Sequence, residues 1–312
     1  FEINFDKNVV IDEGFVKAFS ELVSRITISS DHKIIKGIKL NEIKGMIESF
    51  SIKEEKFIDE IYYVNLGVSF NKKKIFKYLE NNNIFPSIPQ KKTFLFIPII
   101  IDEDKENLLI FSDNKLFSEW NNYNKSYHLI EYVLPTEDLE DLNLIKKNYD
   151  IIEQYDFKEI TNKYNLNDSI ISLIFKSQKK TRILSRITVD DNVVLKNLSF
   201  SNMNLNEIKK RENLINSLKI VYEDYWKDFN KINTSIKLPI YVKIKGDNNL
   251  KISNFEEALN TINLIYDYNI LKFDKDFIYF QIIFNGTPNN FLKFMKDKDL
   301  NFNTQNKTWV LK

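Results

Sequence analysis

Four carboxylates stand close together near the middle of the chain, directly after Pro135 and Thr136: Glu137, Asp138, Glu140 and Asp141. Carboxylate oxygens bind hard cations, but this run lacks the alternating ligand spacing and the central glycine of an EF-hand loop. A structural role is favoured, in which Pro135 ends a strand, Thr136 caps a short helical turn and the carboxylates lie at its positive end. An acidic patch that faces a partner is the next interpretation, and a metal site ranks below it.

Basic side chains form a second candidate surface on or beside two adjacent predicted strands: Lys176, Lys179, Lys180, Arg182 and Arg186. Such a group could bind an acidic partner, lipid head groups or nucleic acid. A solvated strand face is the favoured interpretation.

The remaining titratable residues form no catalytic constellation. The acidic runs 102–104 and 190–191 are predicted turns, because paired acid–base catalysis needs carboxylates held at a defined separation in a cleft. His128 begins a predicted strand with no nucleophile partner in view, so a hydrogen-bonded structural histidine is favoured over a general base. The chain has no G-x-S-x-G, P-loop or G-x-G-x-x-G motif and only 6 Gly. We expect no catalytic residue, no cofactor and no metal, with a hydrolase-type enzyme whose acidic cleft holds Asp138, Asp141 and His128 as the alternative.

Composition removes further classes of site. Cys is absent and His occurs twice, which excludes disulfides, thiol nucleophiles and metal centres rich in either residue. The 45 basic and 44 acidic residues give a net charge of +1, whereas a general nucleic-acid binder usually carries a basic surplus. No apolar run reaches the roughly 18 residues of a membrane span. The chain begins at Phe1, which fits either a cleaved signal peptide or a trimmed start.

The helices and strands expected from the sequence predict an α+β protein. A length of 312 residues favours several domains over one. We predict a small N-terminal α/β module at 1–85, a central mixed-sheet domain at 92–204, a bridging helix at 205–234 and a C-terminal domain at 235–312. In the first module, Asp12 is predicted to cap a helix and a second helix spans 41–50. An alternating strand follows in 60–70, Asn71 caps a further helix, and residues 1–5 suit a first strand.

The central domain combines buried strands with helices. Residues 94–101 are continuously apolar, as a strand buried on both faces is, and 169–176, 181–189 and 193–199 predict an antiparallel run. Short helices are expected at 116–123 and 157–164. The longest helix, 206–232, carries a wide apolar stripe, and four basic residues are predicted to face solvent: Lys209, Lys210, Arg211 and Lys219.

The last segment predicts the order β-α-β-β-α-β of ferredoxin-like domains. A capping box of Ser253 and Glu256 starts its first helix, and Thr287 with Pro288 starts its second. RNA-binding RRM domains share this order, so nucleic-acid binding through this domain is a further alternative. Its third strand, FIYFQIIF, lacks the basic-Gly-aromatic start of the RNP1 pattern. The aromatic residues of that strand are therefore predicted to pack in the core and on the sheet face: Phe277, Tyr279 and Phe280.

Three stretches together resemble a known family. The first is the run Leu22, Val23, Arg25, Ile26, and the last is the final β-α-β-β-α-β order. The second is the central segment, which contains Trp120, the run Pro135, Asp138, Glu140, Asp141, then Lys163–Tyr164 and Asp168. The chain resembles, over nearly its whole length, the exported proteobacterial domain-of-unknown-function family twenty-sixty-six. It departs from that family in being poor in Gly, Ala, Arg and Trp, as the coding bias of an A/T-rich genome would make it.

The resemblance implies an exported protein whose signal peptide is removed and which has no assigned activity. The central domain is also similar to the N-terminal domain of TolB and to the middle domain of a flagellar H-ring protein, both periplasmic interaction modules. The implied function is therefore a non-enzymatic one in the periplasm or cell envelope, through contact with other envelope proteins. The resemblance supplies no catalytic residues.

Overall fold

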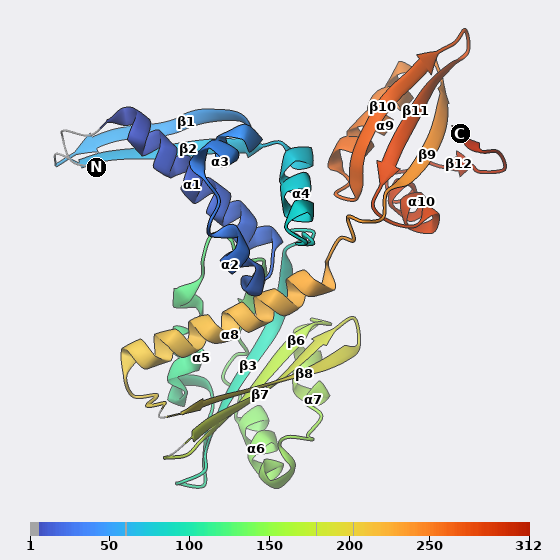
Figure 1. The fold of residues 1–312 in the computed structure, drawn as a ribbon. Helices are drawn as coiled ribbons and strands as arrows, with labels where there is room; N and C mark the ends of the chain where they lie inside the picture. The colour runs from blue at the N-terminus through green and yellow to red at the C-terminus, as the bar shows by residue number, and fades with distance from the viewer. Residues whose placement is uncertain (1–5, 60, 179, 202) are drawn as a thin grey trace. The chain divides into compact units, whose positions relative to one another are not determined.

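The computed structural model describes residues 6–59, 61–178, 180–201 and 203–312 (Figure 1). The predicted α+β class is confirmed, because helices alternate with three separate sheets. Contacts divide the chain into two units, Phe1–Pro89 with Lys227–Lys312, and Gln90–Trp226. The predicted boundaries at 1–85, 92–204, 205–234 and 235–312 stay a prediction.

The first unit begins with a helix packed against a two-stranded ribbon (Figure 1). In chain order its elements are α1 (Lys7–Ile26), a 3₁₀ turn (Ser29–Asp31), α2 (His32–Ile35), α3 (Leu40–Met46), β1 (Ile47–Ile58), β2 (Ile61–Phe70) and α4 (Lys72–Asn81). Phe15 and Phe19 of α1 share a buried core with Ile43 of α3 and Leu79 of α4. Asn71 caps α4 as predicted, its side chain accepting from the backbone N–H of Lys74 at 3.1 Å.

Two predictions for this module are wrong, and a third lies outside the described residues. Helix α1 is capped by Asp6, whose carboxylate accepts the backbone N–H of Asn8 at 2.8 Å. The helix begins before Asp12 because its buried face also includes Val10. Asp12 lies inside the helix. The helix predicted at 41–50 ends at Met46, and a strand replaces its last turn. The strand predicted at 1–5 falls among residues that the structure leaves undescribed.

The C-terminal segment of the first unit has the predicted order with one additional strand. Its elements are β9 (Leu238–Lys245), α9 (Asn249–Thr261), β10 (Ile265–Phe273), β11 (Phe277–Phe284), α10 (Pro288–Lys296), β12 (Phe302–Asn303) and β13 (Thr308–Leu311). Both helices cover one face of the sheet, where Phe255 and Phe291 pack with Phe280. Thr287 caps α10 as predicted, whereas α9 starts before the predicted Ser253–Glu256 box and is capped by Asn248.

Strand direction at one edge of this sheet differs from a ferredoxin-like domain. The order is β10-β11-β9-β13-β12, so β9 and β10 are parallel strands separated by β11, as in a split βαβ unit. In a ferredoxin-like domain, β11, α10 and the next strand would form a second split unit. That strand would then lie beside β9 and run parallel to β11, which makes it antiparallel to β9. Instead β13 pairs with β9 in parallel, and the short antiparallel strand β12 takes the outer edge.

The second unit is a mixed sheet between helices. It contains β3 (Lys92–Asp102), β4 (Asn107–Leu109), α5 (Lys115–Glu119), β5 (Ile130–Val133), α6 (Leu139–Lys147), α7 (Lys158–Thr161), β6 (Ser169–Lys176), β7 (Lys180–Val189), β8 (Asn192–Ser201) and most of α8 (Ile208–Phe229), together with four 3₁₀ turns (Phe111–Asp113, Trp120–Tyr123, Tyr149–Ile151, Asn162–Tyr164). The order is β4-β3-β6-β7-β8, with β5 parallel to the first half of β3.

Strand β3 is covered on both faces, as its unbroken apolar run predicts. Helix α8 lies on one face of the sheet, and α6 and α7 lie on the other (Figure 1). Phe94 and Phe96 belong to the core shared with α8, whereas Leu95 and Ile97 belong to the core shared with α6 and α7. Phe96 stacks on Trp120 with ring centroids 3.9 Å apart. The meander β6-β7-β8 is also as predicted, and its second turn has positive φ at both central residues, Asp190 and Asp191, the conformation of a type I′ hairpin turn.

We expect replacement of the true helix cap to destabilise the first unit. Asp6→Ala should lower the free energy of unfolding by about 1 kcal/mol, because it leaves backbone N–H groups of the first turn of α1 without an acceptor. Asp12→Ala, which removes only an exposed ion pair with Lys44, should cost less than about 0.5 kcal/mol. Urea unfolding followed by circular dichroism measures both, and equal losses would contradict the assignment of the cap.

Candidate functional site

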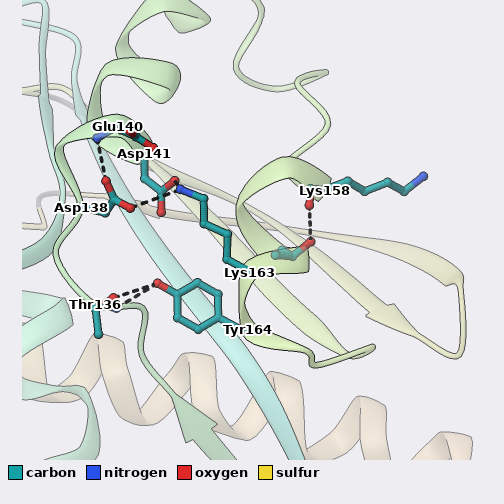
Figure 2. Close-up of polar contacts among 8 residues, drawn as sticks. Thr136, Asp138, Glu140, Asp141, Lys158, Lys163 and Tyr164 are labelled. Carbon is teal, nitrogen blue, oxygen red and sulfur yellow. Dashed lines mark hydrogen bonds and ion pairs between the residues drawn. The ribbon is translucent and has the colours of Figure 1, made fainter.

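The acidic run forms the N-terminus of α6 and the turn that precedes it (Figure 2). Asp138 caps this helix, its Oδ1 accepting the backbone N–H of Glu140 at 2.7 Å. The prediction that carboxylates lie at the positive end of a helix is confirmed, but the cap is Asp138 and not Thr136. The backbone N–H of Thr136 instead donates to the hydroxyl oxygen of Tyr164 at 3.0 Å.

Lys163 draws two of the four carboxylates together. Its Nζ lies 2.6 Å from Asp141 Oδ1 and 3.2 Å from Asp138 Oδ2. Asp141 is only 1% exposed, so the lysine neutralises a carboxylate that water does not reach. Its hydrogen bond to Asp141 raises the pKa of the Lys163 ammonium well above its usual range. The backbone N–H of Glu140, with help from Lys163, lowers the pKa of Asp138.

The other two carboxylates are on the surface. Glu137 and Glu140 are exposed, and the contact that Glu140 makes with Asp138 is through its backbone N–H and not through its carboxylate. Among the described residues, no group of three or more His, Cys, Asp or Glu side chains could hold a metal ion. The acidic run therefore divides into an internal pair that fixes α6 and an exposed pair, and the predicted partner patch rests on Glu137 and Glu140.

Three residues of the predicted basic patch have partners within the fold: Lys176, Arg182 and Arg186. Lys176 lies opposite Asp102 in the sheet, with Nζ 3.1 Å from Oδ2. Arg182 forms an ion pair with Glu153 and lies over the Phe175 ring at 4.1 Å. Lys180 is exposed, and Lys179 lies outside the described residues.

Arg186, like Lys176 and Arg182, has partners within the fold, because it donates to backbone carbonyl groups of the segment after α6. Its guanidinium lies 2.7 Å from the carbonyl oxygen of Tyr155 and 2.8 Å from that of Glu153. Together with Arg182 it fastens residues 153–155 to β7. Two of the five predicted basic residues thus hold the loop that leads from α6 to α7, which is a structural use of their charge.

The remaining candidates occupy structural positions. His128 accepts the backbone N–H of Lys125 through Nδ1 at 3.2 Å, in agreement with a structural histidine. Asp190 lies in the β7–β8 turn, where its backbone N–H donates to Asp168. Asp168 in turn is buried and binds Lys92 at 2.6 Å.

Charged residues inside α8 are the polar cluster that the sequence analysis missed. Arg211 and Lys219 were predicted to face solvent, yet they are 4% and 0% exposed, and Glu223 is 2% exposed. These residues lie eight and four positions apart, beside the apolar positions Leu218 and Tyr222, so they lie on the face that packs against the sheet. Spacing from the apolar stripe was the signal that could have found them.

Each of these buried charges has a partner. Glu223 accepts the backbone N–H groups of Leu129 and Ile130, the latter at 2.9 Å, at the start of β5. The Lys219 ammonium donates to Asn124 Oδ1 and lies 5.2 Å from the centroid of the Trp120 ring and 5.0 Å from that of Tyr132. Burial lowers the pKa of Lys219 to about 8, although the Glu223 carboxylate opposes that shift.

A comparison of the chain with protein-family models, with curated proteins and with solved structures gives no match. The resemblance drawn from the sequence therefore remains a proposal. Among the helices that the structure describes, none is long and apolar enough to cross a membrane.

Lys163→Met should destabilise the second unit, because it leaves the Asp141 carboxylate buried without a counter-charge. Leaving that carboxylate unpaired is expected to cost about 3 kcal/mol in the free energy of unfolding. Lys158→Met is the matched control, since Lys158 pairs with Asp156 where both side chains are exposed, at 79% and 65%. Urea unfolding measures both variants, and a loss for Lys163→Met no larger than that of the control would contradict the role assigned to the pair.

The stability of the protein should also depend on pH through Lys219. Its folded pKa of about 8 lies below the ordinary value of 10.5, so the unfolded chain binds more protons between these pH values. The free energy of unfolding should therefore rise with pH across this window, by roughly 3 kcal/mol from this residue alone. Unfolding curves of the wild type and of Lys219→Met at several pH values measure it. The variant should lose this part of the slope, and parallel profiles would contradict the assignment.

Proposed function

We propose that this protein acts in the periplasm or cell envelope as a non-enzymatic interaction protein that binds other envelope proteins. The observation that carries the proposal is the exposed apolar surface of the β1–β2 ribbon. Large apolar side chains on it are 39% to 56% exposed: Phe50, Phe57, Ile58, Ile61 and Tyr63. Ile58, Ile61 and Tyr63 share one face of the ribbon, because Ile58 pairs with Ile61 and residues two apart in a strand point the same way. Exposed apolar groups that lie together on one face are typical of surfaces that bind another protein.

The use of charge in the acidic run supports the same proposal. A general acid or base must exchange a proton with a substrate, yet Asp138 and Asp141 are both held by Lys163, and Asp141 is buried. The enzyme alternative would need these carboxylates released from that lysine. The resemblance to an exported family of no assigned activity points to the same class of function.

Photo-crosslinking in the native cell, combined with fractionation, tests the proposal. A photoreactive residue in place of Phe57, which is 56% exposed, should crosslink to envelope proteins and fractionate with the cell envelope or periplasm. The matched control is the same residue in place of Leu250, which is 73% exposed on another element. Recovery in the cytosol without a crosslink, or equal crosslinking from both positions, would contradict the proposal.

A second candidate function is binding of single-stranded nucleic acid on the open face of the C-terminal sheet. Phe277 and Tyr279 lie on the face opposite the helices, and Lys243 and Lys272 lie over their rings at 4.5 and 4.4 Å. Phe280, in contrast, is fully buried in the core. Aromatic rings with adjacent cations on an open sheet are typical of surfaces that stack bases.

Retention on a single-stranded oligonucleotide column tests this candidate. Binding should weaken steeply as the salt concentration rises, because counterions are released from the phosphates. It should also weaken in Tyr279→Ala and not in Tyr268→Ala. No retention at low salt would remove the candidate.

A further inference from the structure

A groove runs along the free edge of β2. The ribbon consists of β1 and β2 alone, so β2 has one edge that no strand of the described chain pairs with. Two cavities, of about 550 and about 540 Å³, follow one another along it. Together they touch the consecutive residues 64–68. Because neighbouring residues of a strand point to opposite faces, a cavity that touches all of them lies along the strand edge.

Helix α1 forms the other wall of the groove. The residues of α1 that line it include adjacent pairs that recur every four positions, and they form one stripe of the helix: Glu13 and Gly14, Lys17 and Ala18, Glu21 and Leu22, Arg25 and Ile26. Gly14 lies so close to β2 that a Cβ atom there would come within 2.3 Å of Leu66 Cδ1, and Ala18 lines both cavities. Gly14 thus lets the Leu66 side chain approach the helix closely, and the small side chain of Ala18 leaves space between α1 and β2.

The two ends of the groove differ in charge. Arg25, Lys53 and Lys72 line the first cavity together with a single carboxylate, Glu21. The Lys53 side chain crosses over Gly67 toward the free edge of β2, since a Cβ atom at Gly67 would lie 2.6 Å from Lys53 Cε. Lys53 has no ion pair with any residue described. Lys72 donates to two backbone carbonyl oxygens, those of Asn263 and Ile265, which leave its positive charge uncompensated. The second cavity has the opposite balance, Glu13 and Glu21 against Lys17.

We propose that this groove binds an extended segment of a partner protein, which adds as a third strand to the free edge of β2 and places an acidic side chain at the Lys53 end. This inference rests on the proposed function and names the kind of partner segment that the protein binds. Strand addition satisfies the unpaired N–H and C=O groups of β2, while side-chain charge sets which segments bind. Residues 64–70 of β2 span about 20 Å at ~3.3 Å per residue, which suits a segment of about seven residues.

A labelled probe peptide tests the proposal directly. The probe is an eight-residue, acetylated, fluorescein-labelled peptide of alternating threonine and valine that ends in two aspartates, and its matched control ends in two lysines. Fluorescence anisotropy should show at least fivefold tighter binding of the acidic probe to the full chain. Perturbed backbone amide signals in an NMR titration should fall on β2 and α1. Equal affinity for the two probes, no binding, or perturbations confined to β1 would overturn the proposal.

Variants separate the groove from the rest of the ribbon. Ala18→Trp fills the groove and should reduce binding of the acidic probe at least tenfold, whereas Val16→Trp, on an exposed position of the same helix, should not. Lys53→Glu, a change on the surface that does not threaten folding, should reverse the preference in favour of the lysine probe. An unchanged preference in Lys53→Glu would overturn the proposal, as would binding that appears only after residues 1–5 are removed.

The crosslinking experiment distinguishes failure of the proposed groove from failure of the proposed envelope function. Envelope crosslinks from position 57 that persist in Ala18→Trp, after probe binding is lost, would overturn the groove as the partner site and leave the proposed function standing. Crosslinks lost together with probe binding support both.

Discussion

The burial of charge on α8 constrains the whole second unit. A helix that packs against a sheet with Lys219 and Glu223 on its buried face must give both groups partners, because an unpaired buried charge costs several kcal/mol. Glu223 meets that requirement by accepting two backbone N–H groups at the start of β5, which pairs in parallel with β3. The side chain of one helix thus fixes where an edge strand begins, and with it the register of that strand.

The acidic run follows from the same constraint. The segment from Leu129 to Asp141 is tied at its beginning to Glu223 and at its end to Lys163, so the strand, Pro135 and the first turn of α6 are held at both ends. The carboxylates that looked most like a chemical site owe their position to this arrangement. Asp141 acts as a buried anchor, and Asp138 closes the helix N-terminus. What the run offers to another molecule is reduced to its two exposed glutamates.

Much of the architecture could be predicted because burial imposes a period on the sequence. The unbroken apolar run of β3, the alternation in β2 and the capping residues Asn71 and Thr287 each have one physical meaning. Errors arose where residue type was given more weight than position. Lys219 was placed in solvent because it is a lysine, although it lies four residues from Ile215 on the buried face. Spacing fixes the face of a helix, and partners then decide whether a charge can be tolerated there.

Other features carry no period at all. Strand β1 is exposed along almost its whole length, so its sequence shows no alternation and its pairing with β2 is its main support. Strand β12 has two residues, too few for any pattern, yet it changes the C-terminal sheet because it lets β13 return parallel to β9. Both cases concern backbone pairing, which depends on what lies alongside a strand and leaves no mark in side-chain type.

Charges that are paired inside the fold differ in function from charges that have no partner in the described chain. Charges that neutralise one another inside the fold, such as Asp141 with Lys163, hold the structure and are unavailable to a ligand. Charges such as Lys53, together with an unpaired strand edge, remain to be satisfied from outside the described chain. A surface that combines an open backbone edge, space kept by small residues and an uneven charge has more capacity for recognition than the acidic run. The search for a partner is therefore better directed at the α1–β2 groove than at the residues that look most chemical in the sequence.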